Sequence, residues 1–191
     1  MAVAFETIAE SFRRLRAYIL HDLSLIISAP TGGNYAAVLV VTSACEALGR
    51  LRFGTESGGG RFFGEYLLPV DWRSVANQLY DAVRNGLTHA YETKTILQIG
   101  PHPVELVISW KEKKHLSYEI DKAQLFLNVQ VLVDDLRRAF DRYEEELRSQ
   151  PALRDQYYSW MPRKTTVAIT QATDQKAWKR LLFLAGESSH S

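Results

Sequence analysis

The sequence is poor in residues that could tie the chain together covalently or through a metal ion. Its 191 residues include one cysteine, Cys45, so an internal disulfide is excluded. Cys45 lies in the apolar segment TSACEAL, which favours a buried, inert thiol over a reactive nucleophile. The five histidines are scattered, without the spacing typical of a metal site, so we expect neither a metal nor another cofactor.

An excess of charge and long apolar runs are also missing. The net charge is +1, which excludes the overall basic field of many nucleic-acid-binding proteins, so any such site must be local. No apolar run approaches the roughly 20 residues that span a membrane. Glu6 and Glu10 near the N-terminus are not typical of a signal peptide. We therefore expect a cytoplasmic protein that does not contact membranes.

What the sequence does contain is apolar residues at helical spacing, which predict a mainly α helical bundle. Asn34, Asp71 and Asp121 are the expected N-caps of three of its helices. The second helix is apolar almost all round and should run through the middle of the core. The expected helices cover residues 5–28, 35–51, 72–93, 122–150 and 151–160.

Three short segments rich in β-forming residues interrupt the helical pattern. TILQIG, VELVISW and HLSYEI predict a small β-hairpin or meander inserted at about 95–120. The segment FGTESGGGRFFGEY is expected to be a surface loop, with a mobile lid as the alternative. We expect one helical domain over 1–162 and a partly ordered C-terminal extension over 163–191. A strand at 165–170 and an amphipathic turn at 178–184 are expected in that extension.

The segment VRNGLTHAY, residues 83–91, is unusual for the end of a helix because it contains glycine and several polar residues. On a helical wheel Gly86 falls on the core side with Leu79 and Val83, where it would let a neighbouring helix approach closely. Arg84 and His89 flank the opposite, polar side, about 140° apart. Asp81, Asn85 and Thr88 lie between them.

The simplest interpretation of this polar side is a solvated surface. However, a guanidinium binds phosphate through two parallel hydrogen bonds, and an imidazole exchanges protons near neutral pH. These two groups suffice to assist the cleavage of RNA, because the 2′-hydroxyl of RNA itself supplies the nucleophile.

The segment RNGLTH resembles the R-x(4–6)-H motif of HEPN domains, including the polar residue that follows the arginine. The similarity covers about a dozen residues, LYDAVRNGLTHAY, and more loosely the bundle over residues 5–150. HEPN domains commonly dimerise so that two arginines and two histidines share one cleft. Many are metal-independent endoribonucleases of toxin–antitoxin, abortive-infection or CRISPR-associated systems, and others are non-catalytic modules.

The resemblance implies a role for each residue of the motif. Arg84 would bind the scissile phosphate, His89 would act as general acid or base, and Asn85 would orient them. Asp81 and Thr88 would support these three residues. The implied partners are a second copy of the chain, an RNA substrate, and an antitoxin or other protein. The alternatives are a non-catalytic HEPN-like module that binds RNA, a nucleotide or a protein, and a helical adaptor that docks a partner through its hairpin and tail.

Glu46 is a further candidate, because it lies in the most apolar helix of the sequence. A buried carboxylate is costly unless it is paired. Its simplest partner is Arg50, one helical turn later. Alternatively, Glu46 reaches Arg84 and fixes the orientation of the guanidinium.

Overall fold

The computed structural model describes residues 2–28, 33–90, 96–110, 114–161 and 175–180, with the backbone alone at 85–90, 96 and 99. The chain divides into two compact units, Met1–Met161 and Pro162–Ser191. In the second unit, residues 175–180 are helical, which overlaps the turn expected at 178–184. The strand expected at 165–170 lies outside the described residues.

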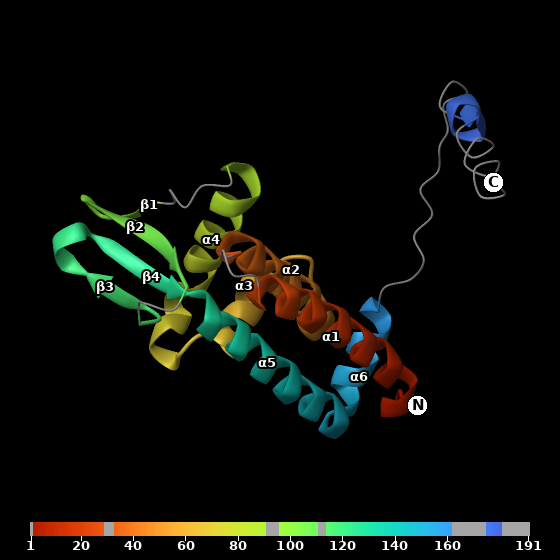
Figure 1. The fold of residues 1–191 in the computed structure, drawn as a ribbon. Coiled ribbons are helices and arrows are strands. Elements are labelled where there is room, and N and C mark those ends of the chain that lie inside the picture. The colour runs from red at the N-terminus through yellow and green to blue at the C-terminus, as the bar shows by residue number, and fades with distance from the viewer. Residues whose placement is uncertain (1, 29–32, 91–95, 111–113, 162–174, 181–191) are drawn as a thin grey trace. The chain divides into compact units, whose positions relative to one another are not determined.

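The first unit is mainly helical with one small sheet, which confirms the expected fold class at that level (Figure 1). The sheet has four strands. The larger elements are connected by a π-helix, named η1, and by two 3₁₀ turns, named η2 and η3. The helices are α1 (Phe5–Ser28), α2 (Asn34–Phe53), α3 (Gly58–Phe62), α4 (Ala76–Ala90), α5 (Val129–Ser149) and α6 (Pro151–Trp160). The remaining elements are η1 (Phe63–Leu67), η2 (Val70–Val75), β1 (Ile96–Ile99), β2 (His102–Ser109), β3 (Ser117–Glu119), η3 (Ile120–Lys122) and β4 (Gln124–Asn128).

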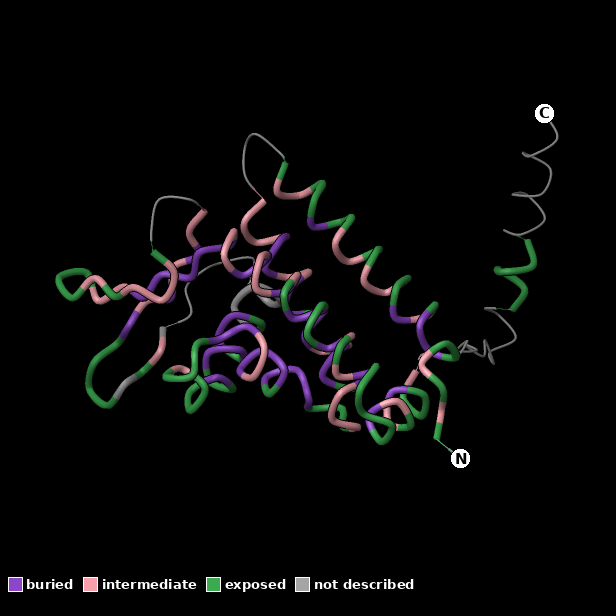
Figure 2. The backbone as a smooth tube through the Cα atoms, turned by 90° about the horizontal axis from the view of Figure 1, so that it is seen from below, coloured by how far each residue is buried: buried purple, intermediate pink, exposed green. Residues whose placement is uncertain are grey.

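Helix α2 runs through the middle of the bundle, as its apolar sequence predicts. It contacts α1, α3, α4, α5 and α6, and its buried residues include Cys45, whose thiol pKa is raised by burial. Buried positions concentrate on the inward sides of the helices around it (Figure 2). Phe12 of α1 lies edge-on to Phe140 and Tyr143 of α5 and to Tyr157 of α6, which joins three helices in one aromatic core.

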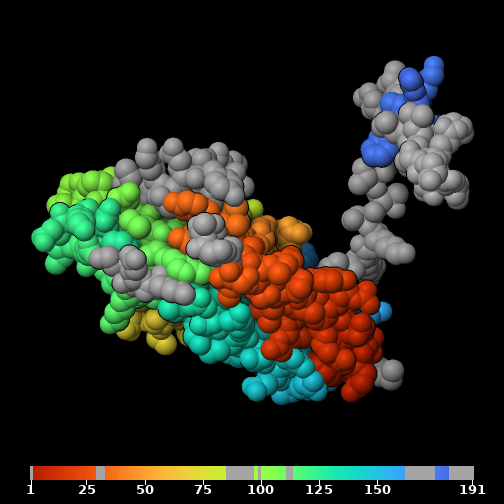
Figure 3. Space-filling view, in the orientation of Figure 1, coloured from red at the N-terminus to blue at the C-terminus, as the bar shows by residue number. Residues whose placement is uncertain are grey.

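Helices α1 and α5 lie side by side on one face of the bundle (Figure 3). Arg16 of α1 pairs with Asp141 and Glu144 of α5 across this contact. Such partly exposed ion pairs each stabilise a fold by at most about 1 kcal/mol. Burial of a core side chain such as Phe12 beneath them contributes more, roughly 1.5–3 kcal/mol.

The sheet is larger than the predicted meander. Its strand order is β1-β2-β4-β3, and β2 pairs with β4 in parallel while the outer pairs are antiparallel. Residues 122–128, predicted as the start of a helix after Asp121, form part of η3 and the strand β4 instead. The run Leu125–Leu127 is buried at every position, and such a continuous apolar run fits a buried strand as well as a helix. Helix α5 begins at Val129, where the Asn128 side chain accepts a hydrogen bond from the Val131 amide at 3.2 Å.

Two other predicted helix starts are also wrong. Gly33, not Asn34, occupies the N-cap of α2, so the residue at this position has no side chain that could cap the helix. Asp71 lies in the 3₁₀ turn η2, and α4 begins five residues later at Ala76. Both the turn and the start of α4 contact η1, and a Cβ on Gly64 of η1 would lie 2.5 Å from the Cβ of Ala76, the first residue of α4. Tertiary packing, rather than the capping residue, therefore sets this boundary.

The triple-glycine segment is neither a surface loop nor a lid. Gly58, Gly59 and Gly60 form the first residues of α3 and are buried against α2 and α4. A Cβ on Gly49 of α2 would clash with the backbone of Gly58, and one on Gly59 would lie 2.6 Å from the Tyr80 hydroxyl of α4. The close helix approach predicted at Gly86 lies outside the described side chains, whereas Gly49 and Gly58 provide one that the sequence analysis missed.

Candidate functional site

Helix α4 has the two faces that the helical wheel predicts, as far as its side chains are described. Ala76, Leu79 and Val83 are buried, and Tyr80 and Ala82 are buried beside them. Asn77, Gln78, Asp81 and Arg84 are exposed. The helical wheel therefore predicts correctly that Arg84 lies on the exposed side of α4, next to the buried Val83 in the sequence.

Arg84 forms an ion pair with Glu46 of α2. Its Nη2 lies 3.2 Å from Oε2 of Glu46 and donates a hydrogen bond to Oε1 at 3.4 Å. Arg50, the simplest partner on sequence grounds, approaches Glu46 only to 3.9 Å and pairs more closely with Glu56. The Glu46 side chain is 32% exposed, so it is not the buried carboxylate that the sequence analysis assumed. Glu46 thus joins two helices at the point where Arg84 reaches the surface.

Arg84 and Glu46 line a small pocket of about 370 Å³ between α2, α3 and α4. Gly59 and Gly60 form part of its wall, where the absence of side chains lets Tyr80 and Asn77 of α4 approach α3 closely. The Tyr80 hydroxyl donates to the Thr42 carbonyl at 3.2 Å, and burial raises the Tyr80 pKa, so this hydroxyl stays protonated near neutral pH.

The same pocket carries more acidic than basic groups. Its lining includes three carboxylates, those of Glu46, Glu56 and Asp81, and one guanidinium, that of Arg84. The predicted supporting residue Asp81 is therefore close to Arg84. A phosphate could bind here only through Arg84 and through cations supplied from elsewhere, because carboxylates repel it.

The remaining predicted site residues lie where only the backbone is described. Asn85, Thr88 and His89 belong to α4, which continues as a helix to Ala90, but their side chains are outside the described part of the chain. The relation between the guanidinium of Arg84 and the imidazole of His89 therefore stays a prediction of the helical wheel.

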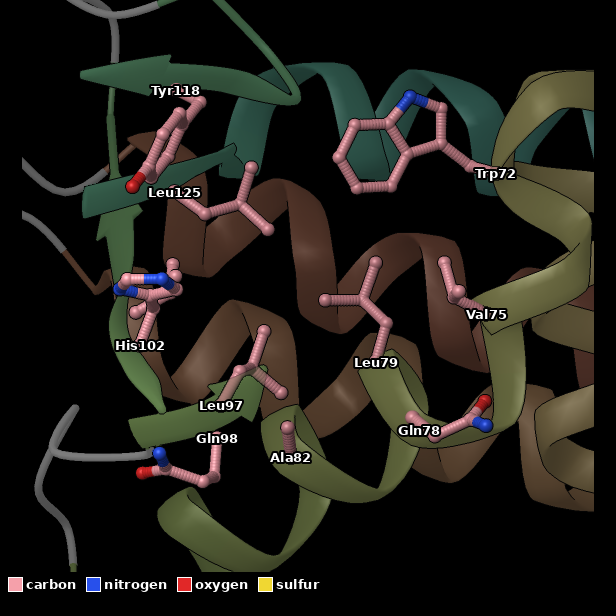
Figure 4. A pocket seen from close by; sticks show the side chains of 11 residues that line it. Trp72, Val75, Gln78, Leu79, Ala82, Leu97, Gln98, His102, Tyr118 and Leu125 are labelled. Atoms are coloured by element: carbon pink, nitrogen blue, oxygen red, sulfur yellow. The ribbon is translucent and has the colours of Figure 1, made fainter. Parts of the chain in front are cut away.

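A second pocket, of about 950 Å³, lies on the other side of α4, between this helix and the sheet (Figure 4). Leu79, Leu97 and Leu125 point into it, and Trp72 of η2 stands at one end. This pocket was not predicted from the sequence, because it arises only where the sheet and α4 leave an apolar gap between them. The apolar residues at 97, 104 and 125 are the one sequence signal for it.

His115 is a histidine whose environment the sequence does not reveal. Its Nδ1 accepts a hydrogen bond from the Asn128 amide at 3.1 Å, and its Nε2 is buried and makes no hydrogen bond to the described residues. Burial lowers the His115 pKa from 6.5 to about 4. No group of three or more potential metal-binding side chains occurs among the residues that the structure describes.

Protonation of His115 should therefore destabilise the fold at mildly acidic pH. Since the pKa is lower in the folded state, the unfolded state binds more protons between about pH 6.5 and pH 4, and stability falls as the pH drops through this range. Urea denaturation near pH 7 and pH 5 would measure this fall in the free energy of unfolding. The fall should be smaller in His115→Asn than in the wild type, and asparagine keeps a hydrogen-bond acceptor for the backbone amide of Asn128. The exposed His102→Asn should behave as wild type, and an equal loss in all three proteins would contradict the assignment.

The fold and site together define a mainly α bundle with an inserted four-stranded sheet and an arginine–glutamate pair between α2 and α4. Comparison with protein-family models, with curated proteins and with solved structures found no match for this chain. Among the described residues, no helix is both long and apolar enough to cross a membrane.

Proposed function

We propose that the protein is a metal-independent endoribonuclease of the HEPN type, in which Arg84 and His89 act on RNA in a homodimer. The observation that carries this proposal is the position of Arg84. Its guanidinium lies at a surface pocket and is held by Glu46, a residue from a neighbouring helix. A guanidinium fixed in this way needs little reorganisation when it meets a phosphate, and such preorganisation is the main source of electrostatic catalysis.

In this mechanism the protein supplies binding and proton transfer. Arg84 binds the scissile phosphate and stabilises the charge that develops on its oxygens. His89 moves the proton of the attacking 2′-hydroxyl or of the leaving oxygen, and Asn85 orients these groups. The 2′-hydroxyl attacks the adjacent phosphorus, so the products carry a 2′,3′-cyclic phosphate and a 5′-hydroxyl.

A homodimer would supply the second arginine and the second histidine that one copy lacks. One copy offers a single guanidinium, whereas a two-fold interface along α4 would bring a second Arg84 and a second His89 to the same cleft, together with the carboxylates of the second copy. We therefore expect a dimer whose two-fold axis passes near the polar face of residues 77–92. Light scattering should give twice the chain mass at micromolar concentration; a monomer would contradict the dimeric site.

The decisive test is digestion of a varied RNA panel in the presence of EDTA. Cleavage should continue without divalent cations, should yield 2′,3′-cyclic phosphate ends, and should stop when a 2′-deoxynucleotide occupies the cut site. Loss of cleavage on adding EDTA, or cleavage of the deoxy substrate, would contradict the mechanism.

The carboxylates beside Arg84 favour a second candidate function, binding without catalysis. Arg84 is paired with Glu46, and the carboxylates of Glu56 and Asp81 line the same pocket, so the guanidinium is already engaged in an ion pair within the protein. In this case the protein is a HEPN-like module that binds RNA, a nucleotide or a protein. A dimer that binds RNA but leaves the whole panel intact would favour this second function.

A further inference from the structure

A second polar pocket adjoins that of Arg84 and has the opposite charge. It has a volume of about 470 Å³, and it shares Gly60 and Asn77 with the Arg84 pocket. Three arginines line it, Arg61, Arg73 and Arg142, against a single carboxylate. The charged lining therefore carries a net charge of +2, which Glu146 beside the pocket partly offsets through its ion pair with Arg142 at 3.1 Å, whereas the lining of the neighbouring pocket is acidic.

Glu65 holds the three arginines together although they come from three different elements. Its carboxylate accepts a hydrogen bond from Nε of Arg61 at 2.7 Å. Its backbone carbonyl accepts from Nη1 of Arg142 at 3.0 Å and from Nη2 of Arg73 at 3.4 Å. Each guanidinium has five N–H donors, so these bonds orient the groups without using up their donors.

Two of the three guanidiniums stack on aromatic rings in cation–π contacts. Arg61 lies over the ring of Phe53 at 4.0 Å, and Arg142 lies over the ring of Tyr66 at 4.3 Å. The Tyr66 hydroxyl donates to Glu146 at 2.5 Å, which fixes that ring in turn. Stacking on a ring leaves the edge of a guanidinium open to an anion, and arginine is the side chain best suited to bind phosphate in this way.

From this geometry we propose that Arg61, Arg73 and Arg142 form a subsite for a backbone phosphate of single-stranded RNA, next to the phosphate that is cleaved. The inference rests on the proposed function, because it takes Arg84 as the contact to the scissile phosphate. Asn77 lies between the two pockets, seven residues before Arg84 on α4, which corresponds to about 10 Å along the helix. A few nucleotides of extended strand cover this distance.

The subsite also accounts for how a chain of net charge +1 could hold RNA. The charge balance of the whole molecule provides no general attraction, so binding must come from a local cluster. Phosphate contacts fix the position of a strand without reading its sequence. The cluster would thus set where the strand lies relative to Arg84, while the choice of the cut site is made elsewhere.

The test measures binding of a fluorescent RNA that carries a 2′-deoxynucleotide at its cut site, by anisotropy over a range of salt concentrations. Arg61→Gln and Arg73→Gln should each weaken binding about three- to tenfold and reduce the salt slope by about 0.7, the value for one phosphate contact on a single strand. Arg14→Gln is the matched control. Arg14 and Arg61 are both 62% exposed and both pair with a glutamate four residues away, but Arg14 lines neither pocket.

The outcomes separate the subsite from the catalytic proposal. Arginine-dependent binding without cleavage by the wild type would support the subsite and contradict the nuclease. Cleavage by the wild type, with Arg61→Gln and Arg73→Gln binding RNA as tightly as Arg14→Gln, would overturn the subsite and leave the nuclease standing. Binding of inorganic phosphate that depends on the same arginines and leaves RNA binding unchanged would assign the pocket to a free anion and overturn the proposed RNA contact.

Discussion

RNA cleavage should fall about 10²–10⁴-fold in Arg84→Ala and by a similar factor in His89→Ala, while both proteins fold normally. The loss follows from the proposed roles, since removing a general acid–base group or a preorganised charge on the phosphate has effects of this size. Arg84 is exposed, so its removal leaves no cavity in the core. Initial cleavage rates and circular dichroism on the same preparations would measure both expectations.

The structure offers matched controls for the two variants. Arg50 also faces Glu46 and is 44% exposed, against 45% for Arg84, but it does not line the pocket. Arg50→Ala should therefore keep its activity, which separates the chemistry of Arg84 from a mere loss of charge beside Glu46. His21 is an exposed histidine of α1, and His21→Ala is the corresponding control for His89.

The double variant tests whether the two residues act together. Residues of one catalytic unit are strongly non-additive, so Arg84→Ala with His89→Ala should be scarcely slower than either single variant. Wild-type rates in His89→Ala would show that the motif assignment is wrong. Equal losses of cleavage rate in Arg84→Ala and Arg50→Ala would show that Arg84 has only a structural role, as the ion-pair partner of Glu46.

Gly49→Val should destabilise the protein by about 3 kcal/mol or more, the largest stability effect that we expect for a single substitution here. The reason is the contact between α2 and α3, where a Cβ at Gly49 would meet backbone atoms of Gly58 and Gly59. Backbone atoms cannot turn aside as a flexible side chain can, so α3 would have to move away from α2. A melting temperature lower by roughly 6–12 °C should result for a domain of this size.

Ser43→Val provides the control for that substitution. Ser43 lies in the same helix and is exposed, so the new valine has the same intrinsic helix propensity but meets no neighbouring backbone. Its free energy of unfolding should stay within about 0.5 kcal/mol of wild type. Similar melting temperatures for the two variants would contradict the close approach of α2 and α3.

The sequence by itself determined three of the helices of this protein, α1, α2 and α6. The apolar spacing over 5–28 and Pro151 at the start of the last predicted helix correspond to α1 and α6 as the structure has them. The apolar stretch after Asn34 likewise forms the central helix α2. The two faces of α4 were predictable over the described side chains up to Arg84, because one period governs a whole helix whichever elements pack against it.

Only the tertiary structure decided the features that give the candidate site its form. Three consecutive glycines favour a loop locally, yet they form a helix here because only they fit between α2 and α4. Leu125–Leu127 became a strand because β2 and β3 pair with it on both sides. Glu46 pairs with Arg84, 38 residues away, more closely than with Arg50, four residues away. In each case a contact between distant segments outweighs the local preference of the chain, and such contacts leave no periodic signal in the sequence.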